Sequence, residues 1–371
     1  MQVKASLALV GEELDAAEGV CINIDEGGVV ESIEGWGSCG DGALGGSWAV
    51  AVPQPANMHV HSADGAFPEF GEDMGLHELV APPGGLKYRL LSSLGFQRTV
   101  ASISRTYARA AAEGVGLLVD FREGGGVGCL AAQEARRLVR GALDVVVLGT
   151  PGPAWPMWCS GLGLSSPLDY PASLVASLAR SHRPSMTHVA EDPANREQGD
   201  LEVALEAGFD AIVHGTHLSE RDLAEVAAAG VGLVSCPRSN LWHGLRPPPV
   251  AAAVRLGVRL ALGSDNAAWA DPSPWAEASL ALELARSQGL RGEAASRAVA
   301  EALFVNGYRM LGLRPRAIEE GREARLVLVD GDAGGILGAA SPLAAIVKRS
   351  GAHLVARVDG TSVAPLGRGL P

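Results

Sequence analysis

An alternation of two kinds of segment in the middle of the chain constrains its fold more than any other feature. Short apolar runs end in polar, Gly or Pro residues, and Ala-rich stretches with helical periodicity follow most of them. We predict strands at eight runs, which are residues 49–59, 115–121, 144–150, 161–165, 184–188, 210–214, 231–236 and 259–264. The helical stretches between them cover residues 98–113, 131–141, 168–181, 201–207, 220–229 and 249–256.

Eight β/α repeats over roughly 250 residues are typical of a (β/α)₈ barrel. We therefore predict an α/β fold in which residues 53–319 form such a TIM barrel. A doubly wound open sheet is the alternative, but no Gly-x-Gly-x-x-Gly motif follows the first run.

Both ends of the chain have the pattern of β segments and lie outside this alternation. Strand-like runs, separated mostly by Gly-rich turns, lie at residues 3–10, 19–24, 28–33, 324–330 and 353–360. We predict that residues 1–52 and 320–371 pair into one small composite β-sandwich domain.

The composition argues against several classes of function. The chain has 371 residues, of which 47% are hydrophobic, so it can bury a large core. A formal net charge of −12 argues against a nucleic-acid or anionic-membrane partner. No apolar stretch reaches the roughly 20 residues that span a bilayer, and the N-terminus has no signal-peptide pattern. The five cysteines are scattered without a Cys-x-x-Cys motif, so we expect reduced thiols in a cytoplasmic protein.

Five side chains that can bind metals fall at the ends of four predicted strands. His59 and His61 end the first run, and their spacing turns both imidazoles to one face of a strand. His188, His214 and Asp265 lie at the ends of the fifth, sixth and eighth runs. The carboxyl ends of the strands of a (β/α)₈ barrel gather at one face, where the chemistry takes place. We therefore expect the five side chains to meet there, and imidazole and carboxylate groups suit a divalent metal.

The chain resembles the amidohydrolase superfamily, in the branch that contains cytosine, guanine and S-adenosylhomocysteine deaminases and chlorohydrolases. The matching motifs are His59-x-His61, His188-x-x-Glu191, His214-Gly-x-x-Leu218, Cys236-Pro-Arg-Ser-Asn240 and Gly263-Ser-Asp265. The resemblance implies one divalent metal ion, with zinc preferred over iron, held by His59, His61, His188 and Asp265. It also fits a homo-oligomer that acts on a small molecule.

Binuclear relatives bridge two metals with a carboxylated lysine near the end of the fourth strand. This chain has no lysine between Lys87 and Lys348, so a bridged pair of metals is not expected.

The resemblance implies a hydrolase of carbon–nitrogen bonds other than peptide bonds. We expect a deaminase in which a metal-activated hydroxide displaces ammonia from an amino-substituted heterocycle or nucleoside. Asp265 would accept a proton from water, His214 would orient the attacking oxygen, and Glu191 would pass a proton to the leaving group. The alternative, with the same metal site, is hydrolysis of a cyclic amide or another C–N or C–X bond, as in imidazolonepropionase-like or chlorohydrolase-like enzymes. A scaffold without activity should have lost some of these ligands, and this chain has the full set.

Candidate substrate contacts lie in the loops after the second, third and seventh runs. Arg122 and Glu123 could bind a carboxylate or hydroxyls, or they could pair with each other. Trp155 could stack on a heterocycle or pack in the core. Arg238 and Asn240 are expected to face the substrate, although Asn240 could instead cap the turn beneath the site.

A long segment at residues 62–97 follows the first run, and we expect it to form a lid or lip over the pocket. Lys87 or Arg89 within this segment could meet an anionic group of the substrate.

Overall fold

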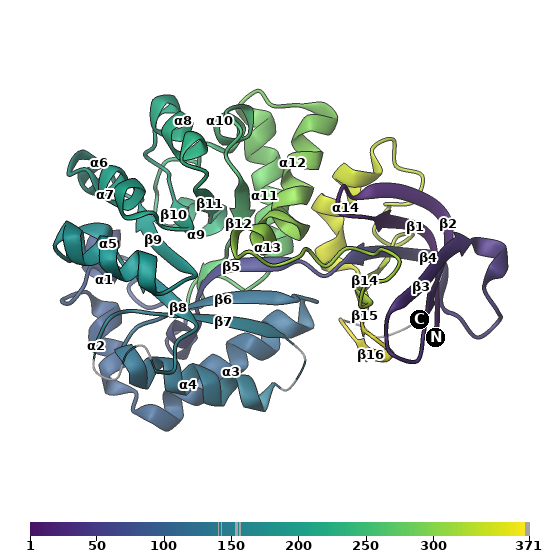
Figure 1. Cartoon of the computed structure of the whole chain (residues 1–371), viewed down its shortest axis with the longest axis horizontal. Coiled ribbons are helices and arrows are strands. Elements are labelled where there is room, and N and C mark those ends of the chain that lie inside the picture. The colour runs from purple at the N-terminus through teal and green to yellow at the C-terminus, as the bar shows by residue number, and fades with distance from the viewer. Residues whose placement is uncertain (140, 142, 153–154, 156, 368–371) are drawn as a thin grey trace.

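The computed structural model describes residues 1–139, 141, 143–152, 155 and 157–367. The larger part of the molecule is a ring of parallel strands surrounded by helices (Figure 1). The strands of the ring are β5 (Ala56–His61), β6 (Leu117–Arg122), β7 (Asp144–Gly149), β8 (Gly161–Leu164), β9 (Ser185–Val189), β10 (Ala211–His214), β11 (Gly232–Ser235), β12 (Leu260–Leu262) and β13 (Asp265–Asn266). They follow the order β12-β11-β10-β9-β8-β7-β6-β5-β13. This is the (β/α)₈ barrel that the alternation of segments predicts.

The eighth strand of the barrel is divided into β12 and β13. The ring closes because these two parts pair with different neighbouring strands. The sequence predicts one strand at residues 259–264, whereas the structure has β12 paired with β11 and β13 paired with β5. Gly263 lies at the break, where a Cβ atom would come within 2.6 Å of the Cβ atom of His59. The backbone of the last strand therefore passes directly against the first histidine of the predicted site.

Helices cover the outside of the barrel because each has one apolar face. In α3 (Phe96–Ala112), the buried residues Val100, Ile103, Tyr107 and Ala110 lie on one helix face. Every residue of β6, β8, β10 and β11 is buried, as expected for a parallel sheet covered by helices. Among the residues that the structure describes, no helix is long and apolar enough to cross a membrane. The other helices are α1 (Leu76–Val80), α2 (Leu86–Ser93), α4 (Gly125–Leu138), α5 (Ala172–Ser181), α6 (Pro193–Glu197), α7 (Asp200–Ala207), α8 (Glu220–Ala228), α9 (Pro237–Trp242), α10 (Val250–Arg255), α11 (Pro274–Ser287), α12 (Gly292–Phe304), α13 (Asn306–Met310) and α14 (Pro342–Arg349).

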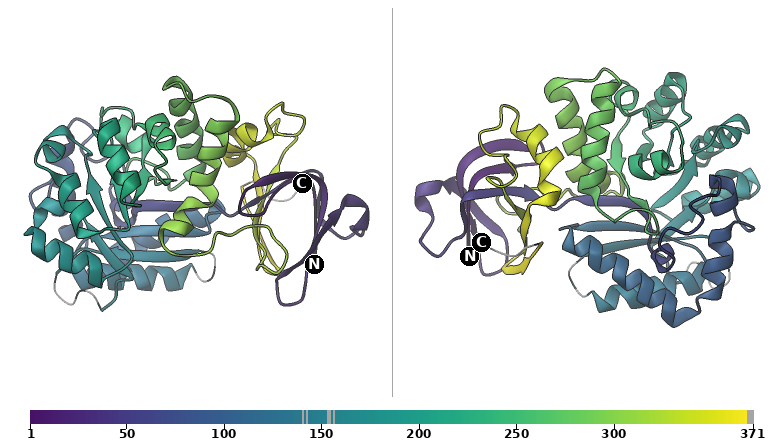
Figure 2. Two further views of the ribbon diagram at one scale, coloured as in Figure 1. Left: turned by 45° about the horizontal axis from the view of Figure 1, so that its top comes forward. Right: turned by 180° about the vertical axis from the view of Figure 1, so that it is seen from behind.

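Segments from both ends of the chain form a second sheet beside the barrel (Figure 2). Its strands are β1 (Gln2–Val10), β2 (Asp15–Ile24), β3 (Val30–Gly35), β4 (Leu44–Pro53), β14 (Arg325–Asp330), β15 (Leu354–Asp359) and β16 (Ser362–Pro365). They follow the order β16-β15-β14-β4-β1-β2-β3. The two ends of the chain join where β4 and β14 pair antiparallel, with Val52 opposite Val327. Side chains from both ends, among them Val3, Ile22 and Leu326, share one apolar core.

The first predicted strand divides between the two sheets. The sequence predicts one strand at residues 49–59, but its first part lies in β4 and its last part in β5. Pro53 and Pro55 lack the N–H groups that would continue a ladder of hydrogen bonds. Between them, the buried side chain of Gln54 donates to the backbone oxygen of Val358 at 3.1 Å. The chain crosses from the terminal sheet into the barrel at these residues.

The expectation of five reduced cysteines is wrong. Disulfides join Cys21 to Cys39 in the terminal sheet and Cys129 to Cys159 at the barrel, and Cys236 is buried and free. The paired residues lie 18 and 30 positions apart in the sequence. No local motif marks such pairs, because strand and helix packing brings them together. The cysteines therefore do not support the predicted cytoplasmic location.

Candidate metal centre

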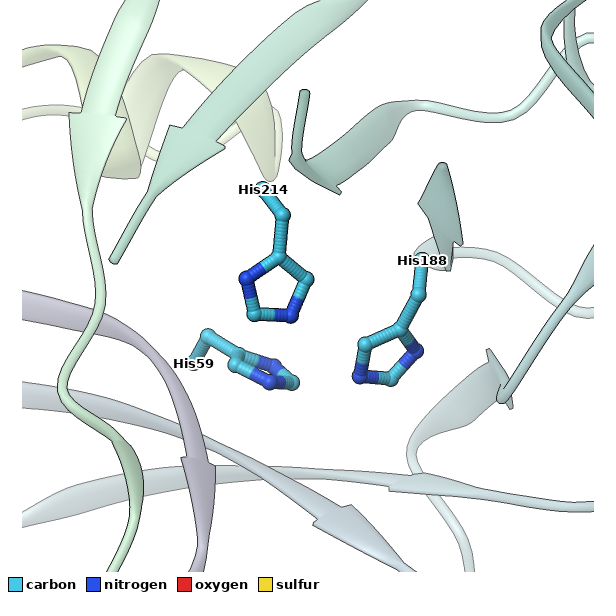
Figure 3. Close-up of side chains that lie close together, drawn as sticks. All are labelled: His59, His188 and His214. Atoms are coloured by element: carbon cyan, nitrogen blue, oxygen red, sulfur yellow. The ribbon is translucent and has the colours of Figure 1, made fainter. Parts of the chain in front are cut away.

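The structure brings the five predicted metal-competent side chains together at the carboxyl ends of the barrel strands. His59 and His61 come from β5, His188 from β9 and His214 from the end of β10, and Asp265 begins β13. The imidazoles of His59, His188 and His214 converge on one point (Figure 3). His59 is 0% exposed and Asp265 6% exposed, so the group is almost closed to solvent.

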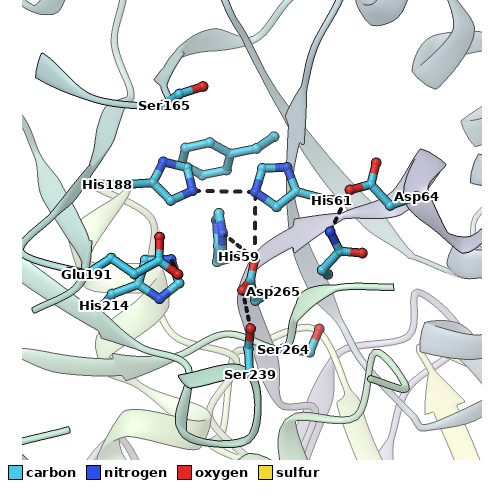
Figure 4. Close-up of polar contacts among 12 residues, drawn as sticks. His59, His61, Asp64, Ser165, His188, Glu191, His214, Ser239, Ser264 and Asp265 are labelled. Atoms are coloured by element: carbon cyan, nitrogen blue, oxygen red, sulfur yellow. Dashed lines mark hydrogen bonds and ion pairs between the residues drawn. The ribbon is translucent and has the colours of Figure 1, made fainter. Parts of the chain in front are cut away.

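Electron-rich atoms of these side chains face one another across short distances (Figure 4). Asp265 Oδ1 lies 3.2 Å from His59 Nε2 and 3.6 Å from His61 Nε2. His61 Nε2 lies 3.4 Å from His188 Nε2. His188 donates from Nδ1 to the backbone oxygen of Leu164 at 2.8 Å, so a neutral ring presents the lone pair of Nε2 to the centre. Lone pairs this close together repel one another unless a cation lies between them.

The imidazoles are in the neutral form that binds metals, not in the charged imidazolium form. Burial lowers the pKa of His59 to about 3 and the pKa of His214 to about 4. Burial also holds the pKa of His188 well below its ordinary value, and the neighbouring imidazoles add to the effect. The rings are therefore neutral near pH 7, which is the form that binds metals. Three imidazoles and one carboxylate suit a divalent ion.

His214 differs from the other three histidines because a side-chain amide faces its second nitrogen. Asn240 Nδ2 lies 2.9 Å from His214 Nδ1, and both residues are buried. With the amide nitrogen placed there, Nδ1 accepts and a neutral ring carries its hydrogen on Nε2. That Nε2 atom lies 3.6 Å from Glu191 Oε1. His214 is thus arranged as a hydrogen-bond donor toward the centre.

The loop that follows β11 supports the site through two neighbouring residues. Helix α9 begins at Pro237, whose ring suits the first turn of a helix. Ser239 donates from Oγ to Asp265 Oδ2, which leaves Oδ1 toward His59 and His61. The next residue in α9 is Asn240, the partner of His214. The two polar residues at the end of this motif therefore orient two members of the site.

The backbone is unusual at the three points where site residues leave their strands. His214 has φ 72° and Asp265 has φ 61°, and Ala190, which precedes Glu191, has φ 49°. Such left-handed values cost residues other than glycine roughly 1–3 kcal/mol. The surrounding barrel holds them, and the turns aim the side chains of His214 and Asp265 into the centre.

Glu191 has the environment of a proton carrier. Burial raises its pKa to about 8, and the nearby carboxylates of Asp265 and Asp192 add to the increase. A carboxyl group with this pKa is largely protonated near neutral pH and can act as a general acid.

A cavity of about 510 Å³ opens beside the histidines. Four acidic residues line it, namely Asp169, Glu191, Asp192 and Asp265. Among the described residues on its wall, the only permanent cation is Lys87. Lys87 Nζ lies 2.6 Å from Glu123 Oε1, so this charge is already paired. Among its described residues, the cavity wall therefore offers an anionic ligand no unpaired lysine or arginine.

The five side chains predicted to contact substrate do not line this cavity. Arg122 and Glu123 are paired with each other, with Arg122 Nη2 2.8 Å from Glu123 Oε2. Arg238 is bound to Glu277, with Nε 2.6 Å from Oε1, and it ties α9 to α11. Each arginine is thus paired with a carboxylate, and none of these four residues lines the cavity.

Trp155 and Asn240 are also placed elsewhere. The ring of Trp155 packs against His182, with centroids 4.4 Å apart, and it contacts the main core of the barrel. Asn240 lies beneath His214, as described above, where it holds that ring. Packing, the other interpretation of Trp155, fits its surroundings, whereas the side chain of Asn240 contacts the ring of His214.

Three supporting residues escaped the sequence analysis. Asn57 accepts from the backbone N–H of Ser264 at 3.1 Å and so fixes the break in the last strand. Asn57 could have been predicted from its position two residues before His59, because residues at this spacing share a face of β5 with both histidines. Ser239 lies inside the motif Cys236-Pro-Arg-Ser-Asn240, but its partner Asp265 comes from another strand. Asp64 lies in the short 3-10 helix Ser62–Ala66 after β5, where no periodicity of the sequence marks it.

The sequence of this chain is similar to that of known hydrolases. The model of the Amidohydrolase family matches residues 176–359. A protein of Methanothermobacter thermautotrophicus named as a candidate aminohydrolase is 28% identical over 296 residues, which cover 70% of this chain and 74% of that protein. The 5-methylthioadenosine/S-adenosylhomocysteine deaminase of Halobacterium salinarum is 32% identical over 178 residues, 44% of this chain and 41% of that protein.

Solved structures share the whole fold. An adenosine deaminase from Xanthomonas campestris with bound zinc superposes with a TM-score of 0.77 at 17% identity, covering 100% of this chain and 94% of that one. An atrazine chlorohydrolase from Arthrobacter aurescens complexed with zinc has a TM-score of 0.79 at 16% identity, covering 98% and 95%. At these identities the similarity is one of fold. The family match over residues 176–359, the sequence relatives and the shared fold together make this chain similar to the hydrolases of the amidohydrolase superfamily, among them deaminases and a chlorohydrolase.

Proposed function

We propose that this protein is a metal-dependent aminohydrolase that releases ammonia from an amino-substituted heterocycle or nucleoside. The observation that carries the proposal is the meeting of metal-binding side chains and a proton-carrying carboxyl group on one cavity. His59, His61, His188 and Asp265 would hold the ion, and their donor atoms suit zinc best, with iron as the alternative. A divalent ion bound there supplies a Lewis acid that makes water a nucleophile near neutral pH.

The side chains of the site would move the protons of the reaction. Asp265 would accept the proton that water loses as its oxygen attacks the carbon bearing the amino group. Glu191, whose pKa is raised to about 8, would donate a proton to the nitrogen that leaves. His214 would donate its Nε2 hydrogen to the charge that develops on the attacked group. The C–O bond forms first, the C–N bond then breaks, and the protonated amino group leaves as ammonia.

The cavity wall supports a planar, uncharged substrate. Trp269 lines the cavity, and its indole is held by a hydrogen bond from Nε1 to the backbone oxygen of Phe70 at 3.2 Å. His243 also lines it, with its ring edge-on to Trp269 and the centroids 4.6 Å apart. Among the described residues, His243 Nε2 has no hydrogen-bond partner, which leaves it for a polar atom of the substrate. Such aromatic walls suit a heterocycle.

Ammonia release tests the proposal. The zinc-loaded protein is incubated with aminated purines, pyrimidines, pterins and their nucleosides, with and without a chelator, and ammonia is measured by a coupled assay. We expect chelator-sensitive ammonia from at least one of them. Asp265→Ala should lose metal and ammonia release while it still unfolds cooperatively, and Asp332→Asn, an exposed control far from the barrel mouth, should keep both.

Two results would contradict the proposal. Undiminished ammonia release by Asp265→Ala would refute the site. Chelator-sensitive consumption of a compound without ammonia would indicate hydrolysis of a cyclic amide or of another C–N or C–X bond by the same metal centre.

A further inference from the structure

Lys87 is a buried cation on the wall of the cavity, and its charge is paired on the inner side. It lies in α2 with 4% of its surface exposed. Its Nζ atom is 2.6 Å from Glu123 Oε1 and 3.1 Å from Asp64 Oδ2. Two carboxylates at these distances fix the ammonium group firmly, because a buried charge without partners is costly.

Glu123 links this lysine to a metal-binding histidine. Its Oε1 atom, which faces Lys87, is also 2.8 Å from His61 Nδ1. Its other oxygen is 2.8 Å from Nη2 of Arg122, a residue that is 2% exposed. The carboxylate is thus held from two sides. A carboxylate beside one imidazole nitrogen keeps the hydrogen there, and the lone pair of the other nitrogen is then free for a metal.

Asp64 connects Lys87 to the last strand of the barrel. Asn266 donates from Nδ2 to Asp64 Oδ2 at 2.6 Å, and Asn266 directly follows Asp265 in β13. Asn266 is also opposite His61 where β13 pairs with β5. Lys87 therefore joins the two strands that carry His61 and Asp265.

The side chains around Lys87 carry no net positive charge. Lys87 and Arg122 face the three carboxylates of Asp64, Asp120 and Glu123. An anionic substrate would meet a group whose formal charge is already negative, so this lysine is poorly suited to attract one.

We propose that Glu123 and Lys87 are positioning residues for the metal ligand His61, and that Lys87 does not bind an anionic group of the substrate. This inference rests on the metal centre of the proposed function. It assigns to the cavity's lysine a role different from the one that its position in the predicted lid suggests.

Metal binding by four variants tests the inference. Metal-free protein is titrated with Co²⁺ against a chromophoric chelator, and the visible spectrum of bound Co²⁺ is recorded. Glu123→Gln and Lys87→Met should bind Co²⁺ about 10–100-fold more weakly and shift its visible bands, since the orientation of His61 is less well fixed. The matched controls Glu134→Gln on α4 and Lys348→Met on α14, both far more exposed, should match the unchanged protein.

The variants also separate positioning from binding of an anion. Unchanged Co²⁺ affinity and spectrum in Glu123→Gln would overturn the proposal. So would a Lys87→Met variant that keeps its metal affinity but no longer binds adenosine 5′-phosphate. Lys87→Met leaves two buried carboxylates without their cation; if circular dichroism shows it unfolded, Glu123→Gln decides alone, because it keeps Lys87 and the shape of the side chain. These readouts need no turnover, so a protein that releases no ammonia would fail the proposed function and leave this inference to be judged on metal binding.

Discussion

At the scale of single residues, the hydrogen-bond partner of Nδ1 determines whether the Nε2 atom of an imidazole presents a lone pair or a hydrogen to the centre. His188 donates from Nδ1 to a backbone oxygen, and His61 places Nδ1 beside the carboxylate of Glu123. Both rings thereby turn a lone pair toward the centre. His214 instead meets the amide nitrogen of Asn240 and turns a hydrogen there. One residue type thus supplies both metal ligands and a hydrogen-bond donor.

The role of Glu191 can be tested apart from metal binding. Glu191→Gln keeps the size of the side chain but carries no acidic proton, so we expect ammonia release to fall about 10²–10⁴-fold. Metal content, measured by mass spectrometry, should not change, because the proposed ligands are other residues. Glu197→Gln, on the exposed side of α6, is the matched control and should be fully active. Wild-type turnover in Glu191→Gln would exclude Glu191 as the proton carrier.

The sequence could predict the residues at strand ends but not the residues that orient them. His59, His188 and Asp265 each follow an apolar run, and the barrel brings such positions together whatever the loops do. Lys87 and Arg238 depend on charged partners from other elements, and those pairings follow no spacing along the chain. For this reason Arg238 lies outside the cavity and Lys87 is already paired on its wall, while the predicted metal-competent residues meet.

At the scale of elements, the break in the eighth strand depends on one glycine. A methyl group on Gly263 would come within 2.6 Å of His59 Cβ and 3.0 Å of His59 N, so Gly263→Ala must push β5 and the last strand apart. We expect a loss of about 1–3 kcal/mol in the free energy of unfolding, together with weaker metal binding. Thermal unfolding and a Co²⁺ titration measure the two effects. Gly42→Ala, with open space around it, is the control, and a Gly263→Ala protein as stable as this control would refute the close approach.

The contact between α6 and α8 should depend on pH. Burial opposes ionisation of Asp222, but the hydrogen bonds from Arg196 and Ser219 lower its pKa from 3.8 to about 2. Because the folded-state pKa is the lower one, this stabilisation is fully present above about pH 4 and is lost as the pH falls through 2. Asp222→Asn should therefore lower the free energy of unfolding by about 1–2 kcal/mol at pH 7 and by progressively less toward pH 2.

Urea unfolding between pH 2.5 and pH 7 checks this dependence, with the exposed Asp41→Asn as control. A difference between Asp222→Asn and the unchanged protein that stays constant over this range would contradict it.

The apolar runs predict where the strands lie, but they do not predict two of the strand boundaries. Residues 49–59 form one apolar run and yet supply strands to two sheets, because Pro53 and Pro55 interrupt the ladder. Residues 259–264 are also one run, but β12 ends at Leu262, and β13 begins only at Asp265, after Gly263 and Ser264. An apolar run shows that a segment is buried, but it does not show where the backbone changes partner.

At the scale of the whole molecule, the disulfides tie down both parts of the fold. Closing loops of this size constrains the unfolded chain and typically stabilises a protein by roughly 3 kcal/mol. We predict that alkylation of the unfolded, unreduced protein modifies one thiol, that of Cys236, and that prior reduction raises the number to all five. Mass spectrometry counts the added groups. Five modified thiols without reductant would show that the pairs are not formed.

The charge of the molecule should select among substrates. The net charge of −12 and the acidic lining of the cavity act in the same direction on an incoming ligand. We expect kcat/KM for a phosphorylated nucleoside to be at least about 10-fold lower than for the same nucleoside without phosphate, with a smaller difference at high salt. Matched pairs such as adenosine and its 5′-phosphate measure it. Equal values within such a pair would contradict the expectation.

The pairing of β13 with β5 also sets when the site can exist during synthesis. The ribosome delivers His59 first and Asp265 last, and the two residues are 206 positions apart. A nascent chain that ends before the last strand holds all four histidines but no Asp265, and nothing yet lies beside β5 to complete the ring. The ligand set is complete only after the final strand docks. A chain that stops before β13 would therefore lack one proposed metal ligand, so the proposed activity requires the last strand of the barrel.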